Sequence, residues 1–114
     1  MMVRNLCLIG APSSAGAYAP GQEKAPATFR RHGLVPALTR SGWRVDDRGD
    51  VPGFRWRLDP QRPKAMNVDA VRRVAAAVAD VVEEALAGGD ASLVLGGDCT
   101  VELGTVAGAL RDER

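Results

Sequence analysis

The alternation of short strand-like segments with helical patterns constrains the fold of this 114-residue chain more than any other feature. The sequence predicts strands over 3–9, 43–47 and 93–95. The first is a nearly continuous apolar run, which is typical of a strand buried on both faces of a parallel sheet. With helices between and after these strands, the order β-α-β-α-β-α implies right-handed crossovers and a parallel sheet covered by helices on both faces.

The clearest helical pattern follows Asn67, the expected N-cap, and ends at the glycine pair 88–89. Its apolar residues recur at spacings of three and four, so they share one face of the helix. These residues are Val68, Val71, Val74, Val78, Val81, Val82 and Leu86.

Shorter helices are expected before the second strand and after the third. Pro26 fits the first turn of a helix that runs to about His32, and Gly33 is expected to end it in a left-handed conformation. A second short helix is expected over 35–40, and a last one starts near Asp98 or Thr100 and runs towards Leu110. Residues 51–66 contain three prolines and predict an irregular excursion.

Composition and charge exclude several classes of protein. Hydrophobic residues make up 46% of the chain and charged residues 25%, which is typical of one globular domain. The net charge of +1 leaves no field that would attract nucleic acid or an anionic membrane, so neither is an expected partner. No apolar run is long enough for a membrane span or a signal peptide. Two cysteines cannot form a disulfide framework, so we expect a reduced, cytoplasmic location.

The loop over 10–22 is rich in glycine, serine and alanine, and it has two chemical interpretations. A nucleotide-binding loop is one, but both the G-x-G-x-x-G pattern and the Gly-Lys-Ser/Thr pattern are missing. A small nucleotide-binding domain therefore stays an alternative on fold analogy alone. Ser13 or Ser14 as a nucleophile needs a positioned base. The sole histidine, His32, shares no motif with them and is interpreted as a residue at the end of a helix.

The second glycine-containing loop follows the third strand and places an acid and a thiol at the start of a helix. Asp98 is interpreted as an N-cap, or as a group that orients a metal ligand. Cys99 is either a small buried thiol or a residue that faces a site, where the helix N-terminus would favour the thiolate. Ligands of parallel sheets bind beyond the carboxyl ends of the strands, which is where this loop lies.

Four segments of the chain, in order and spacing, resemble the ureohydrolases, the family of arginase, agmatinase and formimidoylglutamase. The most specific is Leu-Gly-Gly-Asp-Cys-Thr at 95–100 with Gly104 downstream, which resembles the Gly-Gly-Asp-His-Ser segment of that family. The others are Ile-Gly-Ala-Pro at 9–12, Gly-x-Glu-x-x-Pro-x-x-Phe-Arg at 21–30 followed by Gly-Leu at 33–34, and Asp-Arg-Gly-Asp at 47–50.

The resemblance implies a three-layer α/β/α fold, with residues 1–114 forming the N-terminal part of a single arginase-like domain. It also implies a manganese cofactor and a hydrolase that uses metal-activated hydroxide to cleave a C–N bond of a guanidino substrate. The leading metal-ligand histidine of the family aligns with Cys99, which is thereby the candidate metal ligand of this chain. Thiolate suits zinc or iron better than manganese. The later Asp-x-His-x-Asp and Asp-x-Asp segments of the family do not occur in this sequence.

Two hypotheses follow from the resemblance. The first is a fragment of an arginase-like or agmatinase-like metallohydrolase for a linear amidine, inactive as the 114-residue chain. Glu23, Pro26 and Arg30 are then expected to build the first helix and its entry loop. The second is a non-catalytic α/β interaction module without the metal site. Three parallel strands leave open edges, so either hypothesis predicts a homo-oligomer or association through an exposed sheet edge.

Overall fold

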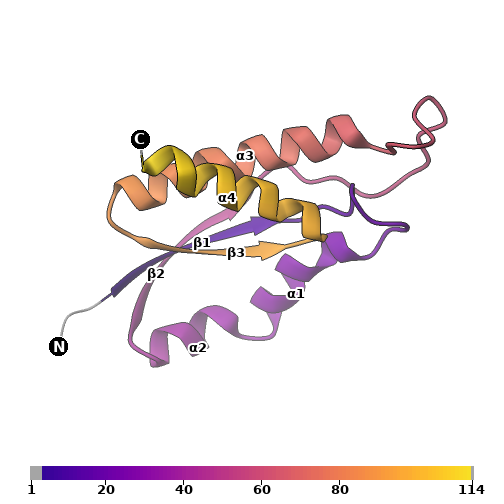
Figure 1. Cartoon of the computed structure of the whole chain (residues 1–114). Helices are drawn as coiled ribbons and strands as arrows, with labels where there is room; N and C mark the ends of the chain where they lie inside the picture. The colour runs from indigo at the N-terminus through magenta and orange to yellow at the C-terminus, as the bar shows by residue number, and fades with distance from the viewer. Residues whose placement is uncertain (1–3, 114) are drawn as a thin grey trace.

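The computed structural model describes residues 4–113, in which a three-stranded parallel sheet lies between two layers of helices (Figure 1). The strands are β1 (Arg4–Ala11), β2 (Trp43–Asp50) and β3 (Ala91–Gly96), in the spatial order β2-β1-β3. Each strand extends beyond its predicted carboxyl end. The predicted start of the first strand at Val3 lies outside the described residues.

Helices connect the strands and cover both faces of the sheet. The chain forms η1 (Gln22–Lys24), α1 (Ala25–Arg31) and α2 (Leu34–Arg40) between β1 and β2, α3 (Val68–Ala87) between β2 and β3, then η2 (Cys99–Val101) and α4 (Glu102–Asp112). In Figure 1, α3 and α4 lie on one side of the sheet, and α1 and α2 lie on the other. The expected three-layer α/β/α architecture is confirmed, as is the β-α-β-α-β-α order, with two short helices in the first crossover.

The main core lies between β1 and α3. Alternate residues of β1 point to the same face of the sheet, so Cys7, Ile9 and Ala11 all meet the apolar face of α3. That face of α3 contributes Val74, Val78, Val82 and Ala85, and Val51 and Val101 complete the cluster. On the opposite face, Leu6 and Leu8 are buried towards α1 and α2. Burial on both faces explains why the first strand reads as a continuous apolar run.

Two glycines let α4 lie unusually close to α3. A Cβ atom at Gly104 would lie 2.6 Å from the carbonyl oxygen of Ala75, and one at Gly108 would lie 2.7 Å from that of Ala79. Both distances are too short for a side chain, so only glycine permits this approach of the two helices.

Two expected helix boundaries have different outcomes. Gly33 adopts φ +91° between α1 and α2, which confirms its left-handed role. Asn67 precedes α3 as expected, but its side chain does not cap the helix. Its Nδ2 instead donates to the carbonyl of Arg57 at 2.9 Å, and its backbone N–H donates to Asp59 at 3.1 Å. Asn67 therefore anchors the irregular excursion over 51–66 to the start of α3.

Candidate functional site

Three segments meet beyond the carboxyl ends of the strands, and we call them together the rim. They are 11–16 after β1, 51–56 after β2 and 96–101 after β3. The strands are parallel, so their carboxyl ends lie at one edge of the sheet, where α/β proteins bind their ligands.

Asp98 is the buried centre of the rim, with 6% of its surface exposed. One carboxylate oxygen accepts a hydrogen bond from the amide of Gly16 at 2.9 Å, and the other accepts from the amide of Thr100 at 2.8 Å and from the Thr100 hydroxyl. The Asp98 amide donates to the carbonyl of Ser13 at 3.0 Å. The predicted N-cap role is confirmed, and the same carboxylate also ties the loop after β3 to the loop after β1.

Glycines make this close contact between the loops sterically allowed. Gly97 has φ +72°, and a Cβ atom there would lie 2.6 Å from the carbonyl oxygen of Ala11. A Cβ atom at Gly16 would lie 2.3 Å from the side chain of Thr100. Any larger residue at either position would push the two loops apart.

Cys99 is exposed and lies directly after Asp98, at the first position of η2. Of the two interpretations of this thiol, exposure favours one that faces outwards at the rim over one that packs in the core. Cys7 is the buried cysteine, and desolvation raises its pKa.

The described residues do not fit a manganese site by themselves. Within 4–113, no group of three or more histidine, cysteine, aspartate or glutamate side chains lies close enough to hold an ion. The Asp98 carboxylate beside Cys99 is already engaged by hydrogen bonds from Gly16 and Thr100.

No pattern in the sequence predicted the contacts between the first rim loop and the segment after β2. Ser14 is fully buried, and its amide donates to the carbonyl of Phe54 at 2.8 Å. Its hydroxyl accepts from the amide of Trp56 at 2.7 Å and donates to the Phe54 carbonyl. These bonds hold Ser14 as a structural residue, and His32 lies exposed at the end of α1. The structure gives no support to a serine nucleophile.

Arg30 of α1 clamps the end of β2. It donates two hydrogen bonds of 3.0 Å to Asp47, one to Asp50 and one of 3.1 Å to the carbonyl of Gly49. The bonds to Asp47 raise the pKa of Arg30. Partial burial of Asp47 opposes its ionisation, but the bonds from Arg30 and the Gly49 amide outweigh this, so the pKa of Asp47 lies below its ordinary value.

Glu23 stabilises the entry to α1. Its carboxylate accepts a hydrogen bond of 2.6 Å from the amide of Gly21 and lies 3.3 Å from the guanidinium of Arg55. The Gly21 bond is the main reason that the pKa of Glu23 lies below its ordinary value. Together with Arg30 and the buried Pro26, this supports the expectation that these residues build the first helix and its entry loop.

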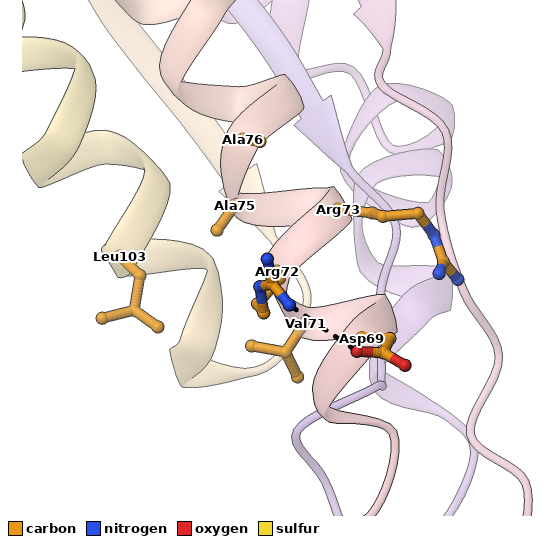
Figure 2. A pocket seen from close by; sticks show the side chains of 7 residues that line it. All are labelled: Asp69, Val71, Arg72, Arg73, Ala75, Ala76 and Leu103. Carbon is orange, nitrogen blue, oxygen red and sulfur yellow. Dashed lines mark ion pairs between the residues drawn. The ribbon is translucent and has the colours of Figure 1, made fainter.

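A shallow hollow of about 590 Å³ on the helical layer lies apart from the residues of the rim (Figure 2). It lies between the first half of α3 and Leu103 of α4, with Ala75 and Ala76 on its wall and Arg72 and Arg73 beside it. Neither Asp98 nor Cys99 contributes to it, so it is a groove between helices.

The chain is similar to known proteins over nearly its whole length. Residues 4–114 match the arginase family. The chain belongs to the arginase family. It is 31% identical over 110 residues to the arginase of Brevibacillus brevis, which covers 96% of this chain and 37% of that protein. It is 36% identical over 104 residues to arginase-1 of Rattus norvegicus, covering 91% of this chain and 32% of that one.

Solved structures of arginases superpose on most of this chain. The Bacillus caldovelox arginase matches with a TM-score of 0.85 and 31% identity, covering 95% of this chain and 37% of the other. The Bacillus subtilis arginase matches with a TM-score of 0.81 and 27% identity, covering 95% and 34%. The arginase-like α/β fold is confirmed, and the chain spans about a third of the length of these relatives.

No helix within the described residues has the length and apolar character needed to cross a bilayer.

Proposed function

We propose that this chain supplies the N-terminal part of a metallohydrolase that cleaves a C–N bond of a linear amidine such as a guanidino compound. The observation that carries the proposal is the segment 95–100, because it lies at the carboxyl end of β3 in an arginase-family chain and matches the family's Gly-Gly-Asp motif. Relatives named arginase support the substrate class. The small guanidino molecule is then the partner of the intact enzyme.

Cys99 is the proposed metal-ligand position, since it aligns with the family's histidine and is exposed at the rim. Asp98 is the proposed positioning residue, because its carboxylate bonds hold the backbone on both sides of residue 99. Manganese prefers oxygen and nitrogen donors, so a thiolate there would shift the preference towards zinc or iron. Further ligands have to come from outside the described residues, and the 114-residue chain is proposed to be inactive alone.

A non-catalytic interaction module of arginase-like fold is the second candidate. Its support is the outer edge of β3, which has no partner strand within the described residues, and the exposed apolar side chains of α4. In this proposal the chain acts by self-association or by pairing through that edge. A cytoplasmic location is proposed for both candidates, as suits a free thiol at the surface.

The test places the rim in a complete arginase. We would replace the corresponding third of the Brevibacillus brevis arginase with residues 4–114 of this chain, with and without Cys99→His. The 114-residue chain should release no urea from arginine or agmatine with added manganese. The Cys99→His chimera should release urea in a manganese-dependent manner, and the Cys99 chimera should be much slower with manganese.

The outcome separates the two candidates. A chimera with Cys99→His that folds, as judged by circular dichroism and thermal unfolding, yet releases no urea would favour the interaction module. Turnover by the 114-residue chain alone would contradict the proposed inactivity.

A further inference from the structure

A second hollow at the rim is lined by loops rather than by helices. It has a volume of about 530 Å³ and lies between the first rim loop and the excursion after β2. We call it the rim hollow. Its lining residues are Ala15, Gly16, Ala17 and Tyr18 from the first loop, and Trp56, Leu58, Pro63, Lys64 and Met66 from the excursion.

The two walls of the rim hollow are fastened to each other. Ser14 bonds to Phe54 and Trp56, and the Phe54 amide donates to the carbonyl of Pro12 at 3.1 Å. At the far end, Asn67 holds the excursion through Arg57 and Asp59. A hollow whose walls are joined by several hydrogen bonds keeps its shape before a ligand arrives, which lowers the entropic cost of binding.

Large apolar side chains gather around this hollow without being buried. Tyr18 is 98% exposed, Leu58 68% and Met66 36%, and Trp56 is half-buried beside them. The small residues Ala15, Gly16 and Ala17 also line it. Exposed apolar residues that surround one concave site indicate a ligand with an apolar body.

The charge at the hollow is positive. Lys64 is its single charged lining residue, and within the described part of the chain no carboxylate lies within ion-pair distance of it. Nearby cations have partners already, because Arg55 pairs with Glu23 and Arg57 lies 5.1 Å from the centre of the Phe54 ring. Lys64 therefore remains available to an anionic group of the ligand.

We propose that the rim hollow binds a monocarboxylate with an apolar body, with the carboxylate at Lys64 and the body against Trp56 and Leu58. This site uses neither Cys99 nor a metal, so it goes beyond the proposed hydrolase and does not depend on it. A ligand of about twelve heavy atoms at ordinary ligand efficiency would have a dissociation constant on the order of 1 mM.

The test compares three probes that share one body and differ in charge: 4-phenylbutyrate, 4-phenylbutanol and 4-phenylbutylamine. Binding to the 114-residue chain is followed by the indole ¹H–¹⁵N signals of its two tryptophans. We expect saturable shifts of the Trp56 signal, with Trp43 as an internal control on β2. Affinity should fall from the carboxylate to the alcohol to the amine, each step by about two- to fivefold, as for an exposed ion pair.

Variants separate the charge from the apolar surface. Lys64→Gln should remove the advantage of the carboxylate over the alcohol, whereas Lys24→Gln should leave it unchanged, because Lys24, the only other lysine, does not line this hollow. Leu58→Ser should weaken all three probes. Equal affinities for carboxylate and amine, equal effects of the two lysine variants, or shifts of Trp43 in place of Trp56 would overturn the proposal.

Discussion

The two edges of the sheet differ in how they meet solvent. The exposed face of β2 carries Arg44, Asp46 and Arg48, and Arg48 pairs with Asp46 at 2.7 Å. Its carboxyl end is also clamped to α1 by Arg30. The β3 edge over 91–96 contains no charged residue at all. Charged edges deter pairing with other strands, whereas an uncharged edge invites it.

The helix that follows β3 extends the same contrast. Leu103, Val106 and Leu110 of α4 are 60%, 57% and 59% exposed, and their spacing places them on one side of the helix. We call these three residues the α4 stripe. The β2 edge is therefore poorly suited to pairing with another strand, while the β3 side offers both a strand edge and an apolar helix face for contact with other polypeptide.

The largest effect should be the difference in reactivity between the two thiols, one on the central strand β1 and one directly after the edge strand β3. Cys99 should react with a maleimide at least about 100-fold faster than Cys7, because Cys7 has no exposed surface and reacts only when the core opens. Mass spectrometry of partially labelled protein measures both rates. In strong denaturant the two rates should converge, and equal rates in the folded protein would contradict an outward-facing Cys99.

A smaller effect is expected from the α4 stripe. Val106→Lys with Leu110→Lys should weaken self-association of the chain by about tenfold or more, because burying two such side chains is worth well over 1 kcal/mol. Sedimentation velocity measures the change. Ala27→Lys on the exposed face of α1 is the control and should have little effect. If both sets of variants associate alike, the β3 side is not the contact surface.

The smallest effect is expected at the β2 edge, where Arg30 binds the end of the strand. Arg30→Met should lower the free energy of unfolding by about 1 kcal/mol at neutral pH, since its partners Asp47 and Asp50 are 34% and 38% exposed and partly screened. The folded-state pKa of Asp47 is lowered, so its ionic contribution is complete above the unfolded value of about 3.9 and is lost as the pH falls through the folded value.

The loss caused by Arg30→Met should therefore shrink in acid. Urea unfolding at several pH values measures it, with Arg31→Met, an exposed neighbour, as the control. A constant difference from neutral pH to pH 2 would mean that Arg30 acts through packing and not through its carboxylate partners.

Much of this architecture could be predicted because it depends on local patterns. The apolar face of α3, the left-handed Gly33 and the N-cap Asp98 are each specified by residues close in sequence. The strands were predicted too short. Polar Asp50 and small Ala91 pair with β1 through backbone hydrogen bonds, which do not depend on side-chain type.

The remainder depended on contacts between distant segments. The Asn67 side chain donates a hydrogen bond to the carbonyl of Arg57 and does not cap the helix that it precedes. Ser14 forms hydrogen bonds with residues about forty positions away. Neither contact has a local pattern. The sequence also did not determine whether Cys99 is exposed. A cysteine directly after a buried strand can pack in the core or face solvent, and its neighbours in the sequence suit both.

The glycine contacts between α3 and α4 have a consequence for residue 99. Because α4 begins directly after the η2 turn that Cys99 opens, the distance between the two helix axes sets the height of that turn above the sheet. A methyl group added at position 104 or 108 would lift the whole of α4 and carry the thiol with it. The placement of an exposed thiol at the rim thus depends on two residues that have no side chain.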